Sequence, residues 1–194
     1  MTTRENLFLN TYQLPRRIQD KIEETTRDII LGDRDRYFMP DCAYGESAKE
    51  MGLPMNPYWS CTIYRKGKKA IDIFKRYDLG FFNRYIRLDT HPIIRAHVTL
   101  HEPNPDRFGI PHNYHIDQRF PHIVALYYIN DADGDTIFCD EHDHSKIIHR
   151  ETPKRGKCVI FEGLHAYHAS SSPTKNLRMT LNINYEKEGL YDHL

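Results

Sequence analysis

Residues 178–184 read Arg-Met-Thr-Leu-Asn-Ile-Asn, and polar and apolar side chains alternate strictly along them. Successive side chains of a β-strand point to opposite faces, so Arg178, Thr180 and Asn182 share one face and the apolar side chains share the other. An arginine on an inward face needs an anionic partner, because an unpaired buried charge is costly. The planar guanidinium of Arg178 can hold a carboxylate through two parallel hydrogen bonds, which predicts an anionic ligand.

A candidate metal site begins upstream with His115-Ile116-Asp117. On an extended strand, His115 and Asp117 would point to the same face and could aim an imidazole nitrogen and a carboxylate oxygen at one ion. His168 follows far enough downstream for several strands to intervene. Two histidines and one carboxylate on one face leave three positions of an octahedral ion open, as in non-haem iron oxygenases.

Two other features of the sequence offer alternative metal ligands. His165 lies three residues before His168 and is a rival for the third ligand. The stretch from His149 to Glu151 is an HxE sequence of similar chemistry. Too few residues separate it from His165 and His168 for the chain to complete strands and return, so we favour His115 and Asp117.

Short β-type segments dominate the second half of the chain, with turn-forming residues between them. Many short strands without intervening helices indicate a sandwich or a barrel. The predicted strands are Tyr58–Tyr64, Ile93–Leu100, Ile123–Ile129, Asp135–Cys139, Ser145–His149, Lys157–Phe161 and Arg178–Asn184.

The first half of the chain predicts helices and loops. Apolar residues at helical spacing predict a helix over Pro15–Leu31, with Gly32 as its C-terminal stop. A second helix is expected over Lys68–Tyr77. The stretches Met39–Pro57 and Glu102–Tyr114 are rich in turn formers and are expected to be loops beside the site.

Composition narrows the class of protein. A chain of 194 residues suits one domain, and 27 basic residues balance 27 acidic ones, which argues against a nucleic-acid binder. The mean hydropathy is -0.70, and no apolar run approaches the roughly 20 residues of a membrane helix. The first six residues lack the apolar stretch typical of a secretory signal, and four scattered cysteines are expected to be free thiols in a reducing cytoplasm.

The order of these motifs resembles the 2-oxoglutarate/Fe(II) oxygenases, in particular the prolyl-4-hydroxylase-like branch. The resemblance covers about Ile93 to Tyr185, and the chain also resembles small oxygenases encoded by marine bacteriophages. The series is HxD at His115–Asp117, Tyr-Tyr-Ile-Asn at Tyr127–Asn130, a GGxTxF-like turn at Asp133–Phe138, Val159–Gly163 before His168, and Arg178 heading the final strand. Asp133 stands where the family has its first turn glycine.

The resemblance implies a double-stranded β-helix, a jelly-roll barrel with N-terminal helices packed outside it. Residues 1–194 would form one dioxygenase domain, with about 1–60 as N-terminal support and about 93–185 as the catalytic core. Fe(II) would bind at His115, Asp117 and His168, and these residues would be the catalytic ones. Arg178 would hold the distal carboxylate of 2-oxoglutarate, with Tyr128 beside it and the Thr180 hydroxyl in support. O2 is the co-reactant, and ascorbate is a further candidate.

The implied reaction is hydroxylation of an unactivated C–H bond, with succinate and CO2 as coproducts. The resemblance favours a peptide or protein substrate carrying a target proline, in the cytoplasm (of the host, if the chain is phage-encoded). A free amino acid, small metabolite or nucleobase is the alternative substrate, and a non-catalytic jelly-roll module is the alternative of another class.

The remaining histidines and tyrosines leave several questions open. Tyr127 and Tyr128 point to opposite faces of their strand, so at most one lines the pocket. His101 is a candidate pocket residue, whereas His112, His122 and His165 are expected to support the ligands or lie at the surface. The polar stretch from Asp140 to His144 favours a solvated hairpin tip over a second metal site.

Overall fold

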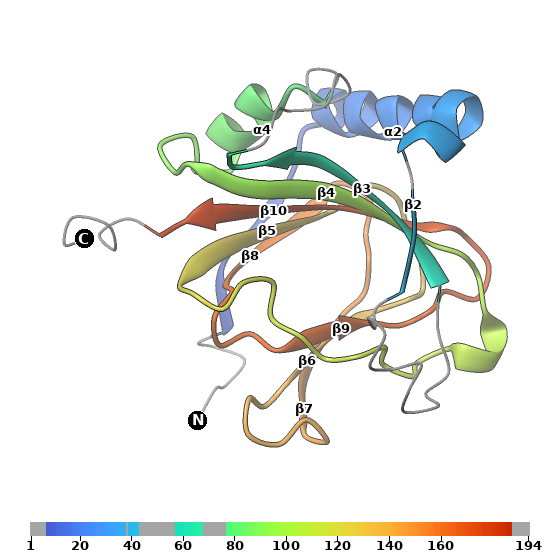
Figure 1. Ribbon diagram of the computed structural model, residues 1–194, viewed down its shortest axis with the longest axis vertical. Coiled ribbons are helices and arrows are strands. Elements are labelled where there is room, and N and C mark those ends of the chain that lie inside the picture. Colours follow the sequence, from blue (N-terminus) through green and yellow to red (C-terminus); the bar gives the residue numbers. More distant parts are fainter. Residues whose placement is uncertain (1–6, 38, 43–56, 68–76, 188–194) are drawn as a thin grey trace.

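The protein, described here from a computed structural model that covers residues 7–37, 39–42, 57–67 and 77–187, is built mainly of antiparallel strands. A seven-stranded sheet and a three-stranded sheet lie opposite each other (Figure 1), and side chains of both line a common cavity. No helix in the described part is long and apolar enough to cross a membrane.

The large sheet has the order β1-β8-β5-β10-β4-β3-β2 and the small sheet the order β7-β6-β9. The bounds are β1 Phe8–Gln13, β2 Met39–Cys42, β3 Pro57–Arg65, β4 Ile93–His101, β5 His122–Tyr128, β6 Thr136–Cys139, β7 Ile147–Glu151, β8 Lys157–Glu162, β9 His168–Ser170 and β10 Arg178–Glu186. The helices are α2 Arg16–Tyr37, α4 Leu79–Tyr85 and the 3-10 turn η2 Pro105–Arg107.

The outer face of the large sheet carries the main core. Helices α2 and α4 cover this face (Figure 1), and Ile22 and Ile29 of α2 are fully buried against it. The predicted N-terminal helix is therefore confirmed, but it does not stop at Gly32. A glycine costs a helix interior only about 1 kcal/mol, so α2 continues to Tyr37.

All seven predicted strands are confirmed to within two residues at each end, although β7 lies two residues later than expected. Strands β1, β2 and β9 and helix α4 were not predicted. The second predicted helix lies almost wholly outside the described residues, as does most of the predicted loop Met39–Pro57. Strand β1 pairs at the edge of the large sheet, and its sequence, Phe-Leu-Asn-Thr-Tyr-Gln, lacks the strict alternation of polar and apolar residues that predicts a strand.

The inner face of the large sheet is polar along β10, β4 and β3, because these strands alternate in register, whereas along β5 and β8 the same face carries a second apolar cluster that includes Leu126 and Val159. Backbone pairing aligns Thr180 with Thr99 and Ser60, and it aligns Asn182 with His97 and Thr62 in the next inward row. The alternate residues of these strands join the core beneath the helices. Along these three strands the large sheet thus separates a stabilising apolar face from a polar face that borders the cavity.

Asp133, which stands where the resembling family has a turn glycine, makes two hydrogen bonds to Thr174. The Asp133 carboxylate accepts a hydrogen bond of 2.8 Å from the backbone N–H of Thr174 and a second from its hydroxyl. The next residue, Gly134, lies so close to the opposite loop that a Cβ would be 2.5 Å from the backbone oxygen of Ser171. The turn before β6 is therefore tied to the segment that leads into β10.

We expect Gly134→Ala to lower the free energy of unfolding by about 2 kcal/mol, because the added methyl must push two backbone segments apart. Gly80→Ala is the matched control. Gly80 lies in α4 with nothing within 4 Å of its missing Cβ, so this change should be neutral or stabilising. Urea unfolding followed by circular dichroism measures both. Equal stability of the two variants would contradict the account of this turn.

Candidate metal site

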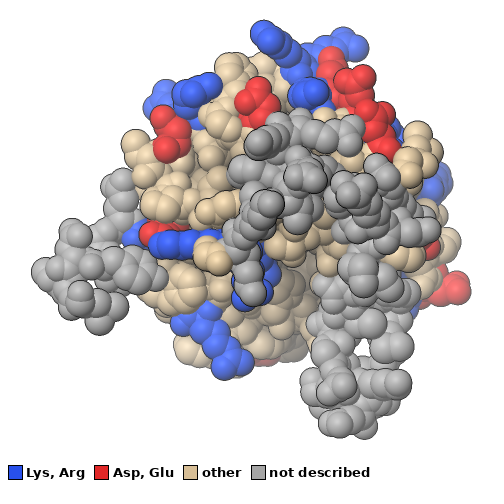
Figure 2. Space-filling model, turned by 45° about the horizontal axis from the view of Figure 1, so that its top comes forward, with Lys and Arg blue, Asp and Glu red and all other residues tan. Residues whose placement is uncertain are grey.

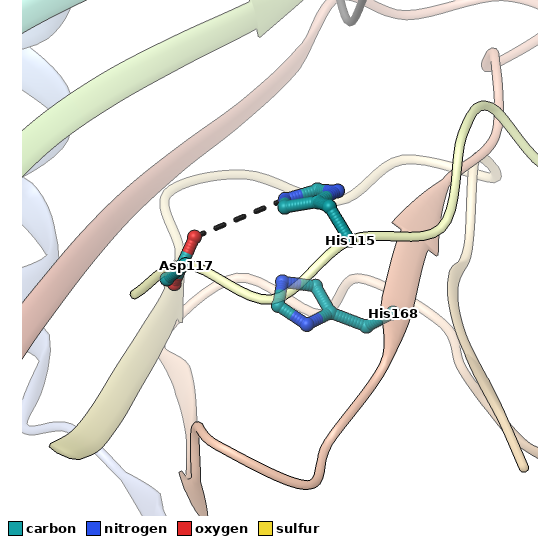
Figure 3. Close-up of side chains that lie close together, drawn as sticks. All are labelled: His115, Asp117 and His168. Atoms are coloured by element: carbon teal, nitrogen blue, oxygen red, sulfur yellow. Dashed lines mark ion pairs between the residues drawn. The ribbon is translucent and has the colours of Figure 1, made fainter. Parts of the chain in front are cut away.

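Direct backbone pairing brings the two candidate histidine ligands together. The His115 N–H donates to the His168 carbonyl at 3.0 Å, and the His168 N–H donates to the His115 carbonyl at 3.0 Å. Residues paired in this way present their side chains on the same face. The two imidazole rings lie 4.7 Å apart between centroids (Figure 3).

Backbone carbonyls fix how both imidazoles are protonated. The Nδ1–H of His168 donates to the Ala166 carbonyl at 2.8 Å, and the Nδ1–H of His115 donates to the Asn113 carbonyl at 3.1 Å. This arrangement leaves Nε2 of each ring with a free lone pair, the form that binds metals. Burial also lowers the pKa of His168 to about 4, so its ring is neutral at pH 7.

The Asp117 carboxylate is buried and held at both oxygens. Its Oδ2 accepts hydrogen bonds from the side-chain amides of Asn182 at 3.0 Å and Asn184 at 2.9 Å. Its Oδ1 lies 3.2 Å from an Arg95 guanidinium nitrogen and 3.8 Å from Nε2 of His115 (Figure 3). Burial alone would raise the pKa of Asp117, but the neighbouring imidazoles and Arg95 outweigh it and hold that pKa well below its usual range.

This donor set fits a divalent transition metal. One ligand atom from each of His115, Asp117 and His168 lies within 4.8 Å of the others, and no other such group occurs among the residues the structure describes. Two imidazoles and one carboxylate suit iron(II). The prediction that His115 and Asp117 lie on one extended strand was wrong. His115 forms an isolated β-bridge and Asp117 lies in a bend after it.

Arg178 lies buried on the same cavity wall with part of its guanidinium unused. Its Nε–H donates to the Gly134 carbonyl at 2.8 Å and its Nη2–H to the Thr136 hydroxyl at 2.7 Å. Only 3% of the residue is exposed. No described carboxylate pairs with it, and its Nη1 has no partner within the described ranges. A buried cation in this state favours an anionic ligand.

The cavity between the sheets has a volume of about 370 Å³ and a mostly polar lining. It contains the three candidate ligands and Arg178, together with Thr180, whose hydroxyl lies 2.6 Å from that of Thr99. The other lining residues are Tyr58, Ser60, Thr62, Arg95, His97, His101, His112, Asn113, Ile116, Leu126, Thr136, Ser170 and Asn182. A cavity of this size and polarity suits a small charged ligand.

Neither tyrosine of the predicted pair is among the lining residues. Tyr127 points into the core beneath the helices. Tyr128 faces between the sheets, and its ring lies 5.9 Å from the Arg178 guanidinium carbon. The Tyr128 hydroxyl already donates to the Thr136 hydroxyl at 2.9 Å. It therefore supports the residue that anchors Arg178, and it does not open onto the cavity.

The other histidines have different surroundings. His165 is half-exposed and pairs with Glu141 at 2.9 Å, so it lies apart from the triad. His122 is fully buried, and Gly163 makes room for it, since a Cβ there would lie 1.9 Å from its Nε2. His101 and His112 line the cavity. The polar stretch from Asp140 to His144 forms the connection between β6 and β7.

The residues that hold the Asp117 carboxylate were only partly predicted from the sequence. Asn184 and Arg95 were given no role, although both continue clear alternating patterns. Residues 95–101 read Arg-Ala-His-Val-Thr-Leu-His, so the polar positions of β4 share one face. That pattern was a usable signal for Arg95.

Known structures match this fold. No protein-family model matches the sequence, and no curated protein sequence matches it significantly. A prolyl hydroxylase from Trichoplax adhaerens, solved with a hypoxia inducible factor peptide fragment, matches with a TM-score of 0.61 and 13% identity, over 93% of this chain and 83% of that one. A Pseudomonas putida prolyl-4-hydroxylase matches with a TM-score of 0.59 and 15% identity, over 94% of each chain.

A third match has a different activity. The non-heme alpha ketoglutarate dependent epimerase SnoN from nogalamycin biosynthesis gives a TM-score of 0.64 and 13% identity, over 94% of this chain and 77% of that one. These likenesses establish that the chain has the fold shared by 2-oxoglutarate/Fe(II) oxygenases. The mainly β architecture expected from the sequence is thereby confirmed.

We expect His168→Ala to weaken Mn(II) binding at least about a hundredfold, because even the partners of metal ligands contribute about 10- to 100-fold. Mn(II) is a redox-silent stand-in for Fe(II), and isothermal titration calorimetry measures the affinity. His165→Ala is the matched control and should bind as the unaltered protein does. If His165→Ala were the variant that loses the metal, the assignment of His168 would be wrong.

The metal-free protein should lose stability as the pH falls from about 6.5 towards 4. Burial and the neighbouring Arg178 lower the pKa of His112 to about 4, and burial lowers that of His97 to about 3. The unfolded chain, with histidine pKa values near 6.5, therefore binds more protons in this window. Each such histidine contributes up to about 1.4 kcal/mol per pH unit.

Urea unfolding in EDTA at pH 7 and pH 5 measures this loss. His112→Asn removes one titrating ring, so it should reduce the difference between the two pH values. A free energy of unfolding that is equal at pH 7 and pH 5 would show that these rings are not held neutral by burial.

Proposed function

We propose that this protein is an Fe(II)- and 2-oxoglutarate-dependent dioxygenase whose metal ligands are His115, Asp117 and His168. The observation that carries the proposal is the convergence of these three side chains in a cavity that also holds the buried, half-used cation of Arg178. The fold is the one these oxygenases share, and we infer that the two sheets form their double-stranded β-helix.

The triad would bind the metal, and residues of β10 would bind the cosubstrate. The triad would hold Fe(II) through Nε2 of His115, Nε2 of His168 and Oδ1 of Asp117, and leave the other positions of the ion to ligands. Arg178 would anchor the distal carboxylate of 2-oxoglutarate, with its Nη1 as the free donor. Thr180 lies on the same inward face of β10, between Arg178 and Asn182, and would border the bound cosubstrate.

Iron(II) with 2-oxoglutarate and O2 supplies an oxidant able to attack an unactivated C–H bond, with succinate and CO2 as coproducts. The protein's part is to orient the ligands and exclude water. The amides of Asn182 and Asn184 serve the first purpose, since they keep the Asp117 carboxylate turned towards the histidines.

We propose a peptidyl, prolyl target as the first substrate to test. Support comes from the fold shared with two prolyl hydroxylases, one of them solved with a peptide. A small polar metabolite is the second candidate, and the polar lining of the cavity favours it. The shared fold also serves an epimerase, so fold alone does not select the substrate.

We expect the protein, given Fe(II), O2 and 2-oxoglutarate, to form succinate slowly even without a substrate. Asp117→Ala should abolish succinate formation, because it removes a metal ligand. Arg178→Gln should mainly raise the KM for 2-oxoglutarate, by about tenfold or more, because it removes a charge-assisted hydrogen bond. Arg150→Gln changes a more exposed arginine outside the cavity and serves as the control. Unimpaired succinate formation by Asp117→Ala would overturn the assignment of Asp117 as a metal ligand, whereas no succinate formation by the unaltered protein would favour the non-catalytic module.

A further inference from the structure

Four side chains form a hydrogen-bonded chain on the cavity wall beside Arg178. The Oγ of Ser172 lies 3.2 Å from Nε2 of His112, and Nδ1 of His112 lies 3.0 Å from Oγ of Ser170. The same Ser170 Oγ lies 3.4 Å from Nε2 of His101. His101, His112 and Ser172 are each at most 5% exposed. The metal triad does not account for this chain.

This series of hydrogen bonds ends at the His101 ring, whose Nδ1 has no partner among the described residues. Nδ1 of His101 is buried and makes no hydrogen bond among the described residues. His101 borders the cavity, and its Cα pairs across the sheet with that of Arg178, so the two side chains share the inward face. Tyr58 stacks on the His101 ring at 5.0 Å and fixes its plane. Buried polar atoms normally have a partner, so this one points to a missing ligand.

The hydrogen bonds of the chain can run in either of two directions. Burial, reinforced by Arg178, lowers the pKa of His112 to about 4 and holds that of His101 well below its ordinary value. Each ring is therefore neutral at pH 7, with one N–H and one acceptor nitrogen. A serine hydroxyl both donates and accepts, so the free Nδ1 of His101 carries either a proton or a lone pair.

An anion bound beside Arg178 would favour one of these two directions of hydrogen bonding. In the favoured one, Ser172 donates to His112, His112 donates to Ser170, and Ser170 donates to Nε2 of His101. That order places a proton on Nδ1 of His101, where it can be donated to the anion. In the opposite order a lone pair would face the anion, which is unfavourable.

We propose that His101 is a cosubstrate-binding residue, whose Nδ1–H donates to the distal carboxylate of 2-oxoglutarate beside Arg178. It would take the role that the sequence assigns to Tyr128, whose hydroxyl is already bound to Thr136. Ser170 and His112 are then positioning residues that orient and polarise the His101 ring. This inference rests on the proposed function, because it takes 2-oxoglutarate as the ligand.

The test compares two keto acids on the Mn(II)-loaded protein by isothermal titration calorimetry. 2-Oxoglutarate has the distal carboxylate, and 2-oxobutyrate lacks it. We expect His101→Gln to weaken 2-oxoglutarate binding about tenfold, as for loss of one charge-assisted hydrogen bond, and to leave 2-oxobutyrate binding unchanged. His101→Asn, whose amide nitrogen can replace Nδ1, should largely retain the affinity. Tyr128→Phe should weaken binding less than His101→Gln.

Ser170→Ala is the second variant, chosen in case His101→Gln does not fold. It removes the hydroxyl that orients the ring and should weaken binding selectively for 2-oxoglutarate. Unchanged 2-oxoglutarate affinity in both variants would overturn the inference and leave the proposed function intact. Equal weakening of both keto acids would assign His101 a structural role and also overturn it. If the unaltered protein bound no 2-oxoglutarate, the proposed function would fail and the inference with it.

Discussion

The candidate site depends on one backbone contact, the paired N–H and C=O groups of His115 and His168. Two hydrogen bonds of 3.0 Å join segments that are distant in the chain and turn both imidazoles to one side. The carbonyls of Asn113 and Ala166 then occupy Nδ1 of each ring, so both Nε2 lone pairs are free. With this bridge in place, the ligand atoms of His115, Asp117 and His168 lie within 4.8 Å of one another.

Strand β10 connects the opposite charges of the cavity. At one end, Asn182 and Asn184 hold the Asp117 carboxylate, and at the other, Arg178 carries a positive charge with a donor to spare. Its alternate residues meanwhile pack into the core beneath the helices. Basic and acidic side chains lie interspersed on the described part of the face seen in Figure 2. Among the ion pairs outside the cavity, Arg155 pairs with Asp20 and Glu23.

Local pattern was enough to predict every strand except β1, β2 and β9, together with the face of β10 that lines the cavity, because alternation is a property of neighbouring residues. The position of Tyr128 could not be read in this way. Its side of the strand was predictable, but the hydroxyl's partner, Thr136, depends on how the small sheet lies over the large one. Two other features likewise depend on contacts between residues distant in the sequence. They are the unpaired Nδ1 of His101 and the ion pair between Arg95 and Asp117. The predicted helix end at Gly32 was wrong because an exposed glycine can end a helix or merely weaken it.

The most direct test of the central claim is the anomalous scattering of Mn(II) in crystals grown anaerobically with 2-oxoglutarate. The account predicts one manganese peak, bound by Nε2 of His115, Nε2 of His168 and one oxygen of Asp117, with the keto acid reaching towards Arg178. A peak at the connection between β6 and β7, or one that His168 does not touch, would contradict it.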